Sequence, residues 1–306
     1  MGTSHPCTGR CDRLANKQQA ATLSVASNTL LVILKVLAGL ASGSVSILSE
    51  AIHSGIDLIA AIIAMFSVRA ASVPADEQHR YGHGKIENFS ALVEGFLIIV
   101  AAGWIIWEAI RKLRGAHGAP EVGVGLWVMG ASAAVNWFIS SYLIRVAKTE
   151  DSMALHADGM HLRTDVYTSL GVFVGLLMVR ITGIGWLDPV VALIVAVMIT
   201  HAGWELCREA IQPLLDARLP KQEETRIASL IESNANEFIS FHGLRTRRAG
   251  SERYIDFHLV VHRSWSLEHV HQLCDRIEQA IQAEFPRSEV LIHPEPCDPR
   301  CPNCEL

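Results

Sequence analysis

Long apolar runs fill the first two thirds of the chain, and short polar segments separate them. A helix needs roughly twenty apolar residues to cross the hydrocarbon core of a membrane. Six runs reach about that length, and their predicted limits are Ala20–Ala41, Val45–Val68, Asn88–Ile110, Val124–Val146, Met160–Thr182 and Leu187–Cys207. The pattern therefore predicts an all-α transmembrane domain of six helices.

A different pattern begins at about Asp216, where the apolar runs shorten and charged residues become frequent. A segment with helical periodicity is followed by two alternating segments that meet at a turn over Ala249–Glu252. A second amphipathic helix has Ser266 as its N-cap, and a last strand contains EVLIHPEP. The order α-β-β-α-β predicts a small cytosolic α+β domain of ferredoxin-like type.

These patterns divide the chain into four parts. We expect a cytosolic tail with cysteines at 1–18, the six-span domain at 19–210, a cytosolic metal-binding and dimerisation domain at 211–296, and a cysteine-rich tail at 297–306. The composition agrees, because 50% of the residues are hydrophobic and only 19% are charged, as is typical of a membrane protein. The net charge of −5 argues against nucleic acid as a partner.

The distribution of lysine and arginine predicts the orientation of the spans. These residues occur in the N-terminal tail and in the loops after the second and fourth spans, and the cluster at Arg111–Arg114 is the exception. By the positive-inside rule, both termini lie in the cytosol. The first eighteen residues are polar and lack the apolar core of a secretory signal peptide. We therefore predict a multi-pass protein of the cell (inner) membrane.

Two predicted spans carry the same ionisable pattern. A histidine is followed four residues later by an aspartate, in His53 and Asp57 and again in His161 and Asp165. Residues i and i+4 share one helix face, so two such faces together offer two imidazoles and two carboxylates. Ionisable groups near the bilayer centre cost a few kcal/mol. A polar cluster that only holds helices together is the alternative, but serine and threonine would do this at lower cost. We predict a divalent-metal site and call these residues the intramembrane quartet.

Acidic residues stand three positions before each histidine of the quartet, at Glu50 and Asp158. They suit either a supporting shell that orients the imidazoles or a step in the ion path. The alternative is a pair of carboxylates near helix ends that contact water. Both interpretations remain open from the sequence.

The loop between the second and third spans contains a further candidate group. Asp76, His79 and His83 can reach one ion if the loop turns back on itself, as Gly82 and Gly84 permit. We predict a metal site there and call these residues the loop cluster. The alternative is a solvated loop on the cytosolic side.

The motifs together resemble the cation diffusion facilitator family of zinc and iron efflux-type proton antiporters. The resemblance rests on SGSVSILSEAIHSGID, PADEQHRYGHGKIE, HLRTDVYTSLG, WLDPVVAL, HGLRTRRAG and LIHPEP, and it extends from about Asn16 to Pro296. It implies that the quartet is the transport site, that two His and two Asp there favour zinc, and that the loop cluster is a regulatory site. The family usually has Asp where this chain has Glu50.

The resemblance also implies a metal site in the cytosolic domain. A two-metal site at the interface of a homodimer would use residues of several segments: His242, His258, His271, His293 and Glu295. Related proteins generally have Asp at the position of Glu295. Exposed histidines that bind nothing are the alternative.

Five of the seven cysteines lie near the chain ends, at Cys7, Cys11, Cys297, Cys301 and Cys304. Cytosolic thiols are normally reduced, so metal binding is favoured over disulfides. Thiolates would favour zinc, cadmium or copper(I). Tails with free thiols that bind no metal are the alternative.

We therefore expect proton-coupled efflux of a divalent cation, with Zn²⁺ as the predicted substrate, by alternating access around the quartet and with metal in the cytosolic domain as regulator. The metal is substrate and regulatory ligand, and no catalytic cofactor is expected. An enzyme is not expected, because the chain has no HExxH and no nucleophile motif. The remaining alternatives are a membrane-anchored metal sensor or scaffold, which needs no charges at mid-membrane, and a carrier mainly for Fe²⁺, Cd²⁺ or Co²⁺.

Overall fold

The computed structural model describes residues 8–42, 45–115, 124–184 and 186–298. The chain divides into two compact units, Met1–Ile211 and Gln212–Leu306. The first unit contains the long apolar runs, and the second contains all three strands. Each unit is described by itself.

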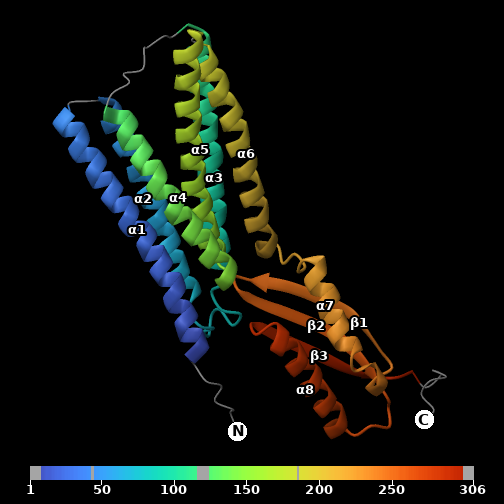
Figure 1. Cartoon of the computed structure of the whole chain (residues 1–306). Coiled ribbons are helices and arrows are strands. Elements are labelled where there is room, and N and C mark those ends of the chain that lie inside the picture. The colour runs from blue at the N-terminus through green and yellow to red at the C-terminus, as the bar shows by residue number, and fades with distance from the viewer. Residues whose placement is uncertain (1–7, 43–44, 116–123, 185, 299–306) are drawn as a thin grey trace. The chain divides into compact units, whose positions relative to one another are not determined.

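The first unit is built from long helices (Figure 1). Their bounds are α1 Thr8–Ser42, α2 Val45–Ala71, α3 Lys85–Leu113, α4 Val124–Glu150, α5 Met153–Thr182 and α6 Leu187–Leu214. In the described residues five of them contain stretches that are long and apolar enough to cross a membrane. The remaining helix, α4, has 27 residues and coincides with the predicted span at 124–146. The prediction of a helical transmembrane domain is confirmed.

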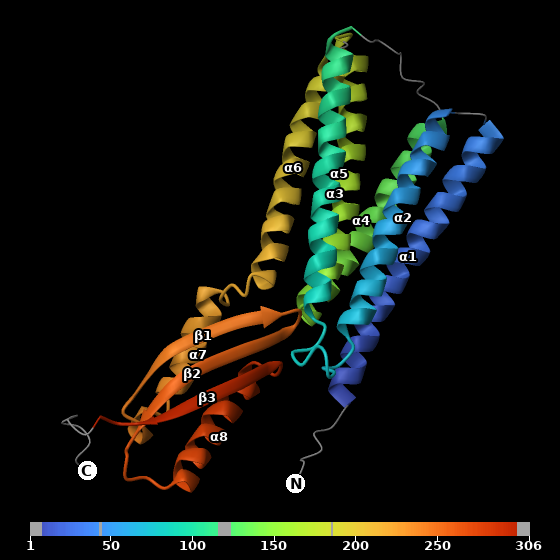
Figure 2. The ribbon, with the colours of Figure 1, turned by 180° about the vertical axis from the view of Figure 1, so that it is seen from behind.

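Small and aliphatic residues bring these helices together. One buried cluster joins Ala20 and Ala21 of α1, Val68 of α2 and Leu143 of α4 to α5. A second cluster joins α3, α5 and α6 around Ala91, Ile98, Ala157 and Leu206. Without a hydrophobic driving force between helices in lipid, close packing of small side chains is the main source of association. Figures 1 and 2 show α2 and α4 beside α1, and α3 and α5 side by side.

Glycines in α3, α5 and α6 permit the closest approaches. A Cβ at Gly159 of α5 would lie 3.2 Å from the Cβ of Leu143 in α4. A Cβ at Gly203 of α6 would lie 3.1 Å from the carbonyl oxygen of Gly95 in α3. Larger side chains at these positions would push the helices apart.

The second unit has the predicted order of elements. Helix α7 (Lys221–Glu232) is followed by a 3₁₀ turn, η1 (Ala235–Glu237), and then by β1 (Ser240–Ala249), β2 (Glu252–Val261), α8 (Leu267–Glu284) and β3 (Ser288–Pro296). Strand β2 pairs antiparallel with β1 and parallel with β3. The predicted turn lies between β1 and β2, with Gly250 at φ +61°. The predicted N-cap is also present, because the Ser266 hydroxyl accepts a hydrogen bond from the backbone N–H of His269.

One face of this sheet packs against both helices (Figures 1 and 2). Alternate residues of β2, Ile255, Phe257 and Leu259, are buried against isoleucines of α7 and α8. Side chains of a strand alternate between the two faces. The intervening residue His258 therefore belongs to the opposite face, as do its neighbours in register, His242 of β1 and His293 of β3. The fold thus gathers histidines from three strands on the face without helices.

Candidate metal centres

The intramembrane quartet is brought together by α2 and α5. His161 Nε2 lies 3.2 Å from Asp57 Oδ1, and both side chains are buried, at 8% and 6% exposed. His53 Nε2 lies 3.9 Å from Asp165 Oδ1. Ligand atoms of His53, Asp57 and Asp165 all lie within 4.8 Å of one another. His161 joins these three residues through its contact with Asp57.

The pairing follows from the direction of the helices. The earlier residue of the α2 motif, His53, meets the later residue of the α5 motif, Asp165, while Asp57 meets His161. This reciprocal pairing requires the two helices to run in opposite directions. Within each helix, the histidine and the aspartate of the motif are about one turn apart. Two short motifs far apart in the sequence thus converge on one point.

The two halves of the quartet differ in exposure. Asp57 and His161 are nearly inaccessible, whereas the His53 side chain is 49% exposed and that of Asp165 is 18% exposed. The quartet therefore contains one enclosed His–Asp contact and one partly exposed His–Asp contact.

From the sequence, Asp158 and Glu50 could either support the quartet or lie at helix ends near water. Asp158 is 1% exposed, which places it away from solvent rather than at a watery helix end. Glu50 belongs to α2, and its side chain lies outside the described residues. Glu50 therefore stays a prediction.

Glu94 of α3 was missed by the sequence analysis. Its side chain is 0% exposed, and it interacts electrostatically with Asp158 and His161 of α5. Glu94 is not part of a His-x3-Asp pattern like those of the quartet. Only the contact between α3 and α5 relates it to the quartet. A charge inside a predicted span was the one available signal.

Two buried lysines of α1 are also held by partners from other helices. Lys35 Nζ donates to Ser54 Oγ of α2 at 2.7 Å. Lys17 Nζ lies 3.1 Å from Glu87 Oε1 of α3. The other oxygen of Glu87 accepts a hydrogen bond from Ser152 Oγ at 2.6 Å, and Ser152 is the N-cap of α5. One carboxylate therefore joins α1, α3 and the start of α5.

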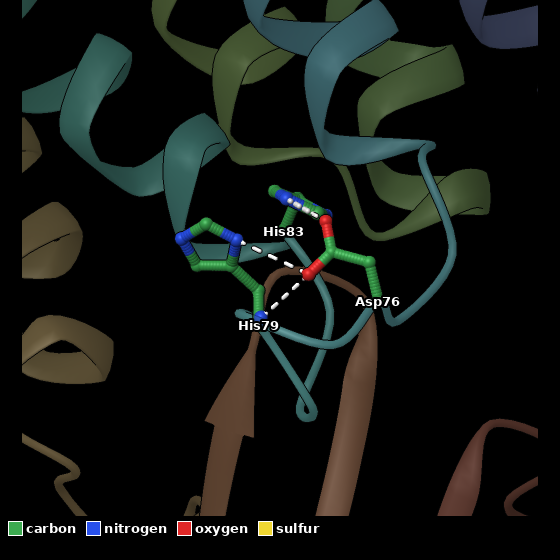
Figure 3. Close-up of side chains that lie close together, drawn as sticks. All are labelled: Asp76, His79 and His83. Carbon is green, nitrogen blue, oxygen red and sulfur yellow. Dashed lines mark hydrogen bonds and ion pairs between the residues drawn. The ribbon is translucent and has the colours of Figure 1, made fainter.

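The loop cluster forms as predicted from its spacing, and Figure 3 shows both histidines around one carboxylate. Asp76 Oδ1 lies 3.4 Å from His79 Nδ1, and Asp76 Oδ2 lies 3.4 Å from His83 Nε2. The backbone N–H of His79 donates to Asp76 at 2.6 Å, and this bond, with that from Gln78, holds the pKa of the Asp76 carboxyl below its ordinary value. A carboxylate that stays charged beside two imidazoles is a suitable ligand set for a divalent cation.

Glu295 gathers the histidines of the sheet face. Its carboxylate lies 2.7 Å from His258 Nδ1, 3.6 Å from His242 Nε2 and 3.9 Å from His293 Nε2. The hydrogen bond from His258 is the main cause that lowers the pKa of Glu295. We call His242, His258, His293 and Glu295 the sheet cluster. Within it, ligand atoms of His242, His258 and Glu295 lie within 4.8 Å of one another.

His271 does not join the sheet cluster within one chain. It lies on α8, 74% exposed, with its Nδ1 3.6 Å from Asp275 Oδ1 on the same helix. Helix α8 packs on the other face of the sheet. A role for His271 in a site shared between two subunits stays a prediction.

The terminal cysteines are largely outside the described residues. This applies to Cys7, Cys301 and Cys304 and to the side chain of Cys11. Cys297 is 2% exposed and is disulfide-bonded, which differs from the expected reduced thiol. A disulfide sulfur is not a thiolate ligand, so Cys297 does not fit the predicted metal site as it stands, and for the other terminal cysteines the site stays a prediction.

Two family models match the chain. Residues 21–215 match the cation efflux transmembrane domain, and residues 219–297 match the cytoplasmic domain of cation efflux proteins. The boundary between the two matches falls close to the division between the two compact units. A solved chain of CzrB in its zinc form is 40% identical and covers 28% of this chain and 96% of that chain, with a TM-score of 0.26.

Full-length relatives extend the similarity over nearly the whole chain. An uncharacterized transporter of Synechocystis, sll1263, is 38% identical over 91% of this chain and 90% of the relative. The cation-efflux pump FieF of Escherichia coli is 32% identical over 91% of this chain and 92% of the relative. Together with the two family models, these matches show that the chain belongs to the cation efflux, or cation diffusion facilitator, family of membrane transporters.

Proposed function

We propose that this protein exports a divalent cation, most readily Zn²⁺, from the cytosol in exchange for protons. The intramembrane quartet is the observation that carries the proposal. Two imidazoles and two carboxylates from opposed helices come together where ionisable side chains are otherwise costly. Four ligands drawn from imidazoles and carboxylates suit the tetrahedral coordination of zinc, whereas oxygen-only sites suit magnesium or manganese.

Proton exchange follows from the chemistry of these ligands. Metal binding requires neutral imidazole and ionised carboxylate, so an incoming cation displaces protons, and protons that enter from the other side displace the cation. Histidine titrates in the range that separates cytosol from a more acidic exterior. In alternating access the quartet stays near the midplane while helices open it to one side and then to the other. This cycle couples a proton gradient to metal efflux.

The remaining predictions fit the same cycle. With both termini cytosolic in the inner membrane, the loop cluster and the sheet cluster lie on the cytosolic side. A homodimer formed by the C-terminal domains would bring two sheet clusters into one assembly. Metal bound there would favour one conformation of the transport cycle and so regulate export.

Purified full-length protein in proteoliposomes provides the test of transport. We expect Zn²⁺ to accumulate inside the vesicles under an imposed pH gradient and the gradient to dissipate in step with it, as followed by a zinc dye and a pH dye. A panel with Fe²⁺, Cd²⁺, Co²⁺ and Mn²⁺ ranks the substrates. Zinc movement equal to that of protein-free vesicles, with and without the gradient, would contradict the proposal.

A separate prediction concerns the sheet cluster. Glu295 is the carboxylate shared by His242, His258 and His293, so Glu295→Ala should weaken zinc binding there by on the order of 100-fold or more, because loss of a ligand costs more than loss of a residue that supports one. Zinc titration of the full chain, carried out in an Asp57→Ala background, isolates this site from the quartet. Glu289→Ala on the same strand is the matched control, because Glu289 is outside the cluster. Equal affinities for the two variants would exclude Glu295 as a ligand.

A further inference from the structure

Two buried carboxyl groups lie beside the quartet, one on α3 and one on α5. Glu94 of α3 is 0% exposed and Asp158 of α5 is 1% exposed. In the described part of the chain, both carboxylate oxygens of Glu94 lack a hydrogen-bond partner, and so does Oδ2 of Asp158. An isolated ionised carboxylate in such surroundings costs several kcal/mol, and in practice the group takes up a proton instead. These two groups are therefore suited to hold a proton.

The groups that act on Glu94 come from its packing partners. Asp158 and His161 of α5 interact with it electrostatically, and no lysine or arginine does so among the described residues. From α6, the thiol of Cys207 donates to the carbonyl oxygen of Leu92, 3.8 Å away and one half-turn before Glu94. Like charges brought close together cannot both ionise at low cost. A state in which at least one of the two carboxyls holds a proton is therefore favoured over one in which both are ionised.

Asp158 connects this pair to the quartet. It interacts with His161 and with Asp57 of α2, and Ser24 of α1 is its polar neighbour. His161 uses Nε2 toward Asp57, while its Nδ1 is buried without a partner in the described residues. Among the described residues, the ion-pair partner of His161 is Asp57 rather than Glu94 or Asp158. The pair thus stands next to the ligands without being one of them.

A change of charge at the quartet should therefore change how readily Glu94 and Asp158 hold a proton. A divalent cation among the quartet adds positive charge a short way from Glu94 and Asp158, and the low dielectric of the interior weakens this field little. The added charge favours release of a proton from the pair to bulk water. Departure of the cation removes that charge, and the pair regains its proton.

We propose that Glu94 and Asp158 form a proton-holding carboxyl pair that releases a proton when the quartet binds its cation and regains one when the cation leaves. The inference rests on the proposed transport function and adds a proton site outside the metal ligands. Glu94 is a coupling residue in this scheme, since it acts through Asp158 and His161 and does not touch the metal.

Calorimetry with Zn²⁺ tests the pair on the full-length protein. Titrations at one pH in two buffers with different ionisation enthalpies give the number of protons released per zinc. The same titrations on Asp57→Ala show how many of the released protons depend on zinc binding at the quartet. We expect Glu94→Gln, which resembles protonated Glu but cannot release a proton, to bind zinc at the quartet while releasing about one proton fewer. A residue with only a structural role would not change this count.

Further variants decide between the outcomes. Glu108→Gln, on the same helix and outside the pair, should leave the count unchanged. Asp158→Asn should lower it as Glu94→Gln does, and the double variant should lower it no further, because the two groups share the proton. Asp158→Asn also serves as the test if Glu94→Gln does not fold.

An unchanged proton count in both single variants would overturn the pair and leave the transport function intact. If instead wild type and Asp57→Ala bound zinc with the same stoichiometry and proton release, the quartet would not be a metal site. Both the transport proposal and the pair would then fail. The two failures are therefore distinguishable in one set of titrations.

Discussion

Asp57→Ala and His161→Ala are each expected to reduce zinc transport in proteoliposomes to the level of protein-free vesicles. Each substitution removes one of four ligands, and the two residues form the buried half of the quartet. Loss of a residue that merely supports a metal ligand costs 10- to 100-fold, so loss of a ligand should cost on the order of 100-fold or more. Initial rates of zinc uptake under a fixed pH gradient measure the effect.

The control for this experiment is an acidic residue of the membrane unit away from the quartet. Glu108→Ala on α3 removes a carboxylate that is paired with Arg111, and its uptake rate should match that of wild type. Size-exclusion profiles show whether each variant remains folded. Normal uptake by either ligand variant, with normal protein yield, would refute the quartet as the transport site.

Glu87→Ala is expected to destabilise the membrane unit by about 3–5 kcal/mol. The substitution leaves Lys17 as an unpaired charge in a site where the side chains of both partners are nearly inaccessible, and it removes the acceptor of the Ser152 hydroxyl. Helix α1, helix α3 and the start of α5 lose their shared contact. Thermal unfolding in detergent, followed by circular dichroism and at matched protein concentration, should show a clear fall in Tm.

A double variant distinguishes the stability lost by leaving one charge unpaired from the stability lost by removing side-chain packing. Lys17→Met with Glu87→Leu replaces both charges by apolar side chains, and buried ion pairs replaced in this way are often nearly neutral in stability. Its Tm should therefore lie closer to that of wild type than the Tm of Glu87→Ala. A double variant less stable than the single one would show that the ion pair is not the source of the effect.

The elements of both units could be predicted because their signals are local. Length and apolarity identify membrane helices, and α3 and α6 cover the predicted runs at 88–110 and 187–207. Periodicity, an N-cap and a turn similarly identify the αββαβ order of the second unit. Such signals lie within a few residues of one another, so they need no knowledge of distant segments.

The quartet was predictable for a related reason. Each half has its ligands four residues apart on one helix, as in His53 and Asp57, and the repetition of this rare pattern in a second span indicates a common site. The sheet cluster was predicted only through a family resemblance, because its residues lie on three separate strands. The structure gathers His242, His258 and His293 with Glu295 but leaves His271 on α8.

The sequence by itself determined which segments are helices and strands, which residues of the quartet share a helix face, and that the loop cluster can close on one ion. Only the tertiary structure decided that Glu94 stands beside Asp158 and that Glu87 holds Lys17 and Ser152 together. The physical reason is that helical period and span length constrain neighbours along the chain. The partner of a single buried charge depends instead on which helices pack together and at what rotation.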